Sequence, residues 1–341
     1  MSYRMSTVQE FGVALVKGAA ILGVDRMVRL LEQWRSGKPV TYRTCRVVGV
    51  TIREPLDLAD GIKLVPLPLT SDDLSARLPS RGRISPSAYL GHTIVSMETI
   101  AKPALFRPDV ENLFNAVEAK LSPHLGFENL CEILSLEFDT YVDMGLGWND
   151  YGDLAALSNA DVTWGEPDRL GQPAACRGES ISGDVMTLDL DYDAVPNPAE
   201  DDLQRLGEAL KAADPRTRVA VARWKRSNDR RKGLTDQFID LRIALESLFL
   251  PHKSDQQLSF RLALTGAWLL GKEAEERQDA YKILKKAYGT ASLAVHHGEV
   301  RESDANRDLL ARAQGRCRAG IYQVLQEGRV GDWDALVLGV E

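Results

Sequence analysis

The sequence predicts an α+β protein in which an N-terminal mixed α/β domain is followed by a C-terminal all-α bundle. Short apolar and β-branched runs between turn signals occupy much of the first part of the chain, whereas apolar residues recur at helical intervals beyond residue 200. The pattern changes at Val195-Pro196-Asn197-Pro198, inside an acidic run, which is typical of a domain boundary. We therefore predict domains at residues 1–195 and 200–330.

The N-terminal domain is predicted to begin with one helix over the first thirty-five residues, which ends at Ser36-Gly-Lys-Pro39. Strands follow over residues 40–69, where Asp60-Gly61 between the runs 45–52 and 62–65 predicts a hairpin. The remaining elements of this domain are predicted as strands at 93–97, 133–142 and 185–192 and a helix at 110–121.

The C-terminal domain is predicted to be helical almost throughout. Proline or glycine residues interrupt the apolar periodicity, as expected at helix ends. Short connections between helices are typical of a bundle. The predicted helices are 200–212, 216–231, 235–250, 256–271, 273–297 and 303–326.

Composition excludes several classes of protein. Hydrophobic residues make up 44% and charged residues 27% of the 341 residues, a globular balance, and no run reaches the about 18 apolar residues of a membrane span. The N-terminus lacks a signal-peptide pattern, and the four cysteines lack metal or disulfide spacing. We expect a cytoplasmic protein with no membrane contact, no metal and no cofactor.

The charge is unevenly distributed. The net charge of −7 argues against nonspecific coating of nucleic acid, but residues 184–202 are acidic and residues 216–232 are basic. A local RNA-binding or RNA-cleaving site therefore remains possible on composition alone.

The end of the helix predicted at 273–297 is the candidate for chemistry. Tyr288, Ser292 and His296 are each four residues apart and therefore share one face. The helix dipole favours an imidazolium at His296, and Gly298 can supply a left-handed cap. A histidine in this place can act as a general acid or base, or it can simply cap or pack the helix.

Four motifs in this half of the chain resemble the HEPN superfamily, and most closely its Apea-like branch, which is associated with anti-phage defence in bacteria. The resemblance covers residues 216–326. In chain order the motifs are Arg223-Trp224, then Asp236-Gln-Phe-Ile-Asp-Leu-Arg-Ile-Ala-Leu-Glu-Ser-Leu-Phe249, then Phe260-Arg-Leu-Ala263, and finally Tyr288, Ser292, Val295, His296 and Gly298.

The resemblance implies a helical bundle that forms a homodimer and cleaves RNA without a metal. An Arg-x4-His motif from each copy would meet in one composite site, where arginine holds the phosphate and histidine moves a proton as the ribose 2′-OH attacks. His296 matches the family histidine, and Ser292 matches the residue that follows the arginine. Tyr288 and the adjacent His297, which is expected to face solvent, would contact the RNA.

The arginine position of the motif holds Ala291, and no histidine of the chain has an arginine five residues before it. Two explanations stay open. The chain can be a natural degenerate member that binds RNA or a nucleotide or only dimerises, or alanine can have replaced arginine to silence a toxic nuclease. Either way we expect little or no cleavage, because losing such an arginine costs on the order of a thousandfold or more.

Glu246 lies inside the apolar run 243–249. It can face the bundle centre, orient the site and pair with the family arginine, or it can pair with Arg242 or with another helix. A basic cluster around Trp224 can bind an RNA backbone, and Arg226 and Arg230 are its predicted RNA contacts. Alternatively its charges are only solvated and Trp224 anchors the core. The cluster comprises Arg223, Lys225, Arg226, Arg230, Arg231 and Lys232.

The resemblance thus implies a metal-independent endoribonuclease of toxin-like or abortive-infection defence, silenced here by Ala291. The alternative is a non-catalytic HEPN-like module that binds a nucleotide or a regulatory partner protein and restrains that partner. The N-terminal domain would sense a trigger, restrain the nuclease or select the RNA.

Overall fold

The computed structural model divides the chain into two compact units. The first, here called the sheet unit, consists of Met1–Leu125 and Asp143–Glu200, and the second, the helical unit, consists of Gly126–Val142 and Asp201–Glu341. The structure describes residues 15–16, 19–20, 22–36, 40–58, 61–69, 86–101, 124–150, 162–163, 170, 176–182, 185–195, 197–250, 257–328 and 335.

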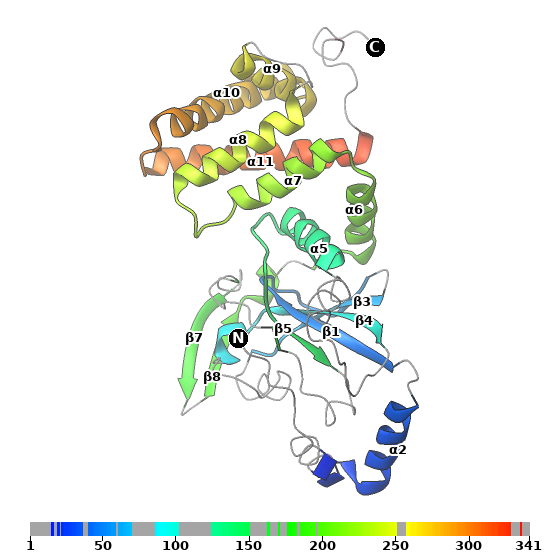
Figure 1. Ribbon diagram of the computed structural model, residues 1–341. Helices are drawn as coiled ribbons and strands as arrows, with labels where there is room; N and C mark the ends of the chain where they lie inside the picture. Colours follow the sequence, from blue (N-terminus) through cyan, green and yellow to red (C-terminus); the bar gives the residue numbers. More distant parts are fainter. Residues whose placement is uncertain are drawn as a thin grey trace. The chain divides into compact units, whose positions relative to one another are not determined.

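An antiparallel sheet forms the centre of the sheet unit (Figure 1). Its strand order is β2-β3-β4-β1-β5-β6, so β1 lies inside the sheet between β4 and β5. The strands are β1 (Val40–Val48), β2 (Leu56–Asp57), β3 (Ile62–Pro66), β4 (Thr93–Ala101), β5 (Met144–Asp150) and β6 (Val162–Thr163).

A second hairpin joins the core of this unit. Its strands, β7 (Cys176–Ser182) and β8 (Val185–Leu190), pair antiparallel, and the Leu188 N–H donates to the Leu69 carbonyl at 2.9 Å. Leu188 is buried in one cluster with Val47, from β1, and Leu146, from β5. The unit also contains the α-helix α2 (Val24–Arg35) and two short 3-10 helices, η2 (Pro86–Tyr89) and η5 (Tyr192–Ala194).

The strands predicted at 93–97 and 185–192 are confirmed by β4 and β8. The expected turn is present at Gly61, which has φ +71°, but its hairpin pairs β2 with β3 rather than β1 with β3. The single N-terminal helix is also wrong, because Gly23 has φ +86° and interrupts the helical residues before α2. The helix predicted at 110–121 lies outside the described residues.

The strand predicted at 133–142 is wrong, because its first half belongs to helix α5 (His124–Glu137) and its second half forms the turn that follows the helix. Its apolar residues alternate locally, but Leu130, Cys131 and Leu134 are buried at helical spacing. The Val142 N–H then donates to Ser135 Oγ at 3.0 Å, which closes the turn after the helix.

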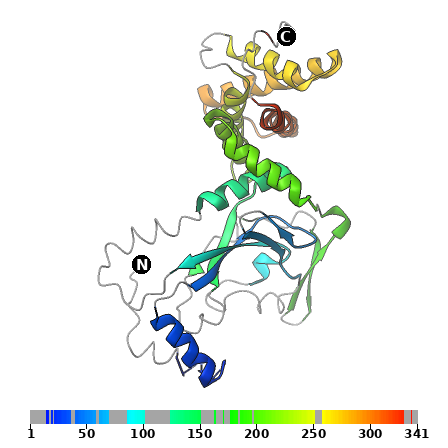
Figure 2. The ribbon, with the colours of Figure 1, turned by 90° about the vertical axis from the view of Figure 1, so that its right-hand side faces the viewer.

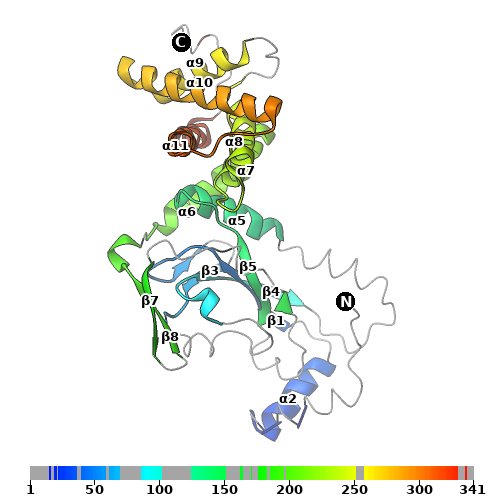
Figure 3. The same ribbon diagram turned by 90° about the vertical axis from the view of Figure 1, so that its left-hand side faces the viewer.

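The helical unit confirms all six predicted C-terminal helices to within a few residues. Helix α8 packs against α7, α10 and α11, and Figures 2 and 3 view α11 nearly along its axis. The helices are α6 (Glu200–Ala212), α7 (Pro215–Ser227), α8 (Leu234–Phe249), α9 (Leu258–Leu270), α10 (Ala274–His297) and α11 (Asp304–Glu327).

Helix α5 is bound to α11 within this unit. Arg318 donates from Nε to the Leu136 carbonyl at 2.6 Å and from Nη2 to the Glu137 carbonyl at 3.1 Å. The Tyr322 hydroxyl donates to the Glu137 carboxylate at 3.1 Å. The segment Gly126–Val142 therefore belongs to the helical unit, although the sequence placed it in the N-terminal domain.

Candidate nucleic-acid interface

Ala291 lies in the packed interior of the helical unit. It is 2% exposed, and Ala287 and Ala294, one turn to either side on α10, are equally buried. Such a strip of small side chains lets a helix approach its neighbours closely. An arginine at position 291 would begin inside this packing, so its guanidinium could reach solvent only if neighbouring groups moved.

The last turn of α10 emerges from the packed interior. Gly298 has φ +78° and its N–H donates to the Ala294 carbonyl at 2.9 Å, which confirms the predicted cap. His296 and His297 are exposed, and Leu293 and Val295 beside them are 54% and 52% exposed. The face shared by Tyr288, Ser292 and His296 thus runs from a buried residue through a half-buried one to an exposed one.

Glu246 forms a polar network between α8 and α10. Its Oε1 accepts from Arg242 Nε at 2.8 Å and from the Tyr288 hydroxyl at 2.8 Å. The Arg242 guanidinium also lies 4.8 Å from the centre of the Tyr288 ring. Glu246 therefore pairs with Arg242 and with a second helix, which is the structural alternative that the sequence left open.

The same network shifts the ionisation of Tyr288. Burial, followed by the hydrogen bond to Glu246, raises the pKa of the Tyr288 phenol to about 12. The hydroxyl is held inside the unit, so Tyr288 joins two helices and presents little surface to a ligand.

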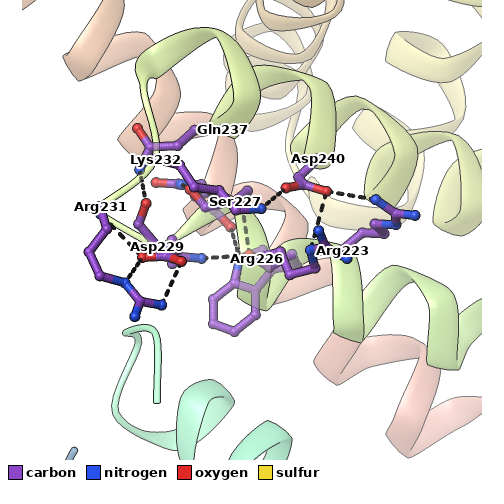
Figure 4. Close-up of polar contacts among 11 residues, drawn as sticks. Arg223, Arg226, Ser227, Asp229, Arg231, Lys232, Gln237 and Asp240 are labelled. Carbon is purple, nitrogen blue, oxygen red and sulfur yellow. Dashed lines mark hydrogen bonds and ion pairs between the residues drawn. The ribbon is translucent and has the colours of Figure 1, made fainter. Parts of the chain in front are cut away.

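Asp240, on α8, organises cations of α7 and of the turn between α7 and α8 (Figure 4). The Asp240 side chain is only 6% exposed and accepts from Arg223 Nη1 at 2.8 Å and from Lys232 Nζ at 2.5 Å. Arg226 Nε lies 3.8 Å from the same carboxylate, with 55% of the Arg226 side chain exposed. One carboxylate therefore holds three cations together, and the cluster keeps an excess of positive charge.

Asp229 fixes the conformation of the turn itself. Its carboxylate accepts from Arg231 Nε at 2.7 Å and from Arg231 Nη2 at 2.8 Å, so the two side chains form a bidentate ion pair (Figure 4). Burial opposes ionisation, but the hydrogen bonds from Arg231 outweigh it and lower the pKa of Asp229. Gln237 Nε2 donates to the Asp229 carbonyl at 3.0 Å, which ties the turn to α8.

Trp224 anchors α7 in the core. It is fully buried, and its Nε1–H donates to the Gln314 carbonyl on α11 at 2.9 Å. The Gln314 side chain donates in return to the Ser227 carbonyl at 2.7 Å. The indole is therefore not placed to stack on a base, and the cations around it are the part of the cluster that faces solvent.

A cavity of about 320 Å³ opens beside the turn. It brings two residues that the sequence did not suggest, Glu302 and Arg307, next to Arg230 and Lys232. Glu302 accepts from the Leu234 N–H at 3.3 Å and from Arg307 Nη2 at 2.5 Å. The complete lining is Arg230, Lys232, Leu234, Gln237, Glu302 and Arg307.

No protein-family model, curated protein or solved structure matches this chain. The resemblance to the HEPN superfamily therefore rests on the sequence motifs quoted above. Within the part of the chain that the structure describes, no three His, Cys, Asp or Glu side chains are grouped to hold a metal ion. None of the described helices is long and apolar enough to cross a membrane.

Proposed function

We propose that the helical unit is a HEPN-like RNA-binding module that does not cleave the RNA it binds. The observation that carries the proposal is the local excess of cations at the α7–α8 turn. Residues 223–240 contain six Lys or Arg and three Asp, although the whole chain has a net charge of −7. We call the five cations Arg223, Arg226, Arg230, Arg231 and Lys232 the basic surface.

The chemistry of the basic surface suits the RNA backbone. Arginine binds phosphate through paired N–H donors, and Asp240 and Asp229 hold several of these cations in place, which limits the entropy lost on binding. Arg226 and Arg230 are exposed, and among the described residues Arg230 has no hydrogen-bond or ion-pair partner. Phosphate contacts of this kind bind RNA with little sequence preference.

The burial of Ala291 supports binding without cleavage. A phosphate clamp is expected to begin at a position from which its side chain reaches the ligand, whereas position 291 packs against other helices. The natural-alanine explanation accounts for this packing directly, because alanine fills the space without strain.

Removal of two exposed arginines tests the proposal. Arg226→Ala with Arg230→Ala should weaken the binding of single-stranded RNA. The slope of log K against the logarithm of the salt concentration should also become shallower by about 1.4, because each lost phosphate contact reduces its magnitude by about 0.7. Fluorescence anisotropy at several salt concentrations measures both. Lys282→Ala with Lys286→Ala, two exposed lysines on α10, removes the same charge elsewhere. Equal effects of the two double variants would reject the basic surface as the binding site.

A silenced homodimeric endoribonuclease is the second candidate. The exposed Leu293 and Val295 favour it, because a second copy could cover them and bring two His296 side chains into one site. Ala291→Arg should then produce cleaved RNA with 2′,3′-cyclic phosphate ends and should slow cell growth. Our first proposal expects neither, so appearance of these products would overturn it.

A further inference from the structure

The cavity beside the α7–α8 turn has the charge of an anion site. Arg230, Lys232 and Arg307 contribute three positive charges to its lining, and Glu302 contributes one negative charge. Lys232 is ion-paired with Asp240, whereas Arg230 is exposed and the Arg307 side chain is 63% exposed. The cations come from two separate parts of the helical unit, the α7–α8 turn and the start of α11.

The beginning of α8 adds backbone donors to the same place. Its N-cap residue is Gly233, which makes no side-chain hydrogen bond to the first turn. Helix N-termini need an acceptor for these N–H groups and favour negative charge. Here the acceptor for the Leu234 N–H is the carboxylate of Glu302, which is far away in the sequence.

The contact of Glu302 to the helix N-terminus is long for a charged acceptor. Its contact to the Leu234 N–H is 3.3 Å, whereas charge-assisted N–H···O bonds are usually about 2.7–2.9 Å. Its side chain is 54% exposed and its other oxygen binds Arg307, itself mostly in water. The carboxylate can therefore turn into solvent at low cost and leave the helix N-terminus and Arg307 to another anion.

We propose that this cavity is a phosphate-monoester subsite, in which a terminal phosphate of RNA or the phosphate of a free nucleotide replaces the Glu302 carboxylate. A monoester carries about −1.5 to −2 charges at pH 7 and three acceptor oxygens, so it satisfies more donors than one carboxylate does. A phosphodiester inside an RNA strand is linked to a nucleotide on each side, which hinders its entry into a concave site. A terminal phosphate is linked on one side only and can enter it. The RNA form of the proposal rests on the proposed function, because the basic surface then holds the adjoining strand.

The direct test compares one RNA sequence carrying a 5′-phosphate, a 3′-phosphate or hydroxyls at both ends, together with the matching mononucleotides, all titrated into the full chain. We expect one phosphorylated end to bind about tenfold more tightly than the hydroxyl-ended strand, since one added charge-assisted hydrogen bond gives about that factor. Arg307→Ala should remove most of the preference.

Glu302→Gln provides the decisive variant. It keeps an acceptor for the Leu234 N–H but removes the competing charge, so binding of the phosphorylated ligand should tighten while hydroxyl-ended RNA gains much less. Glu299→Gln, at an exposed residue before α11, makes the same change of net charge outside the cavity and should leave the preference unaltered. Thermal melting of each variant checks that it is folded.

The outcomes separate the two proposals. RNA binding through the basic surface without any preference for a phosphorylated end, in both the parent chain and Glu302→Gln, would overturn the subsite and leave the proposed function standing. Tight binding of mononucleotides that Arg307→Ala abolishes, without RNA binding, would support the subsite for a free nucleotide and reject the proposed function.

Discussion

Two buried carboxylates set the geometry of the basic surface. Asp240 holds Arg223 and Lys232, while Asp229 holds Arg231, so the guanidinium and ammonium groups are positioned before any ligand arrives. A buried carboxylate is tolerated only with such partners, and removal of one side of the pair leaves the other unsatisfied. The same residues therefore contribute to folding and to the proposed binding.

Asp240→Asn should reveal the structural part of this role. The substitution removes the charge that holds three cations, and we expect it to lower the free energy of unfolding by about 1–3 kcal/mol. Urea denaturation followed by circular dichroism measures the change. Asp236→Asn, at an exposed carboxylate on the same helix, should change stability by less than about 0.5 kcal/mol. A similar loss in both variants would show that Asp240 has no special structural role.

Tyr288 should titrate abnormally. Its pKa is raised to about 12, so the neutral phenol is the form that the folded state favours. The resulting stabilisation is fully present below the unfolded pKa of about 10 and is lost as pH rises towards the folded value. The ultraviolet absorbance of tyrosinate, taken as the difference between the parent chain and Tyr288→Phe, reports this transition. A difference curve centred near pH 10 would contradict the network with Glu246.

At the scale of elements, α10 packs through small residues. The strip of Ala287, Ala291 and Ala294 is buried, and on α9 a Cβ added at Gly266 would lie 2.5 Å from Cδ1 of Leu284 on α10. The contact between α9 and α10 is therefore so close that the contacting face of α10 leaves no room for a larger side chain. The free energy of unfolding should therefore fall when the side chain at position 291 is enlarged.

Ala291→Arg should destabilise the helical unit by about 1–3 kcal/mol or more, because it overpacks a filled interior and buries a charge. The midpoint of thermal unfolding measures this cost. Leu293→Arg, two residues along at an exposed position, serves as the control and should have little effect. If the Ala291→Arg variant were as stable as its control, the position would be able to accept an arginine, as the silenced-nuclease explanation requires.

The elements also show what the sequence can predict. The six C-terminal helices were predictable because their apolar periodicity is long and ends at residues such as Pro215, Gly233 and Gly298. The stretch around Ile133 was misassigned, because a short apolar run fits both periods and only burial separates them. Glu246 could be assigned two partners, and only the packing of α8 on α10 selects Arg242 and Tyr288.

The cavity was beyond prediction from the sequence for a related reason. Arg230 and Lys232 belong to a visible basic run, but Glu302 and Arg307 stand in an ordinary helix start some seventy residues later. Nothing local marks them as neighbours of the α7–α8 turn. Their proximity follows from the way α8 and α11 pack, which is a property of the whole unit.

At the scale of the whole molecule, the chain enters the helical unit twice. Residues Gly126–Val142 belong to it, and the remainder follows from Asp201. The earlier segment contributes buried leucines at 130, 134 and 136, and each fully buried leucine contributes about 1.5–3 kcal/mol. The second entry, at Asp201, lies near the boundary predicted at residue 195, whereas the first entry was not predicted, although Ser122-Pro123 and Gly126 stand beside it.

A fragment of residues 201–341 should therefore be less stable than the same region in the full chain. A synthetic peptide of residues 124–142 should bind it and raise its thermal midpoint, with Arg318 and Tyr322 making the polar contacts. Calorimetry and circular dichroism measure binding and stability. A peptide in which Leu134 and Leu136 are changed to Asp is the control. A fragment that is fully stable without the peptide would contradict the assignment of α5 to this unit.

The early position of α5 also affects how the protein is made. A ribosome releases this helix before α6 and α11, which it contacts in the folded protein, have been synthesised. During that interval the nascent chain exposes leucines that the finished protein buries. We expect translation pauses that occur once residue 142 has left the ribosome, but before α6 and α11 have, to favour chaperone binding and aggregation, whereas pauses after residue 328 has left it should not.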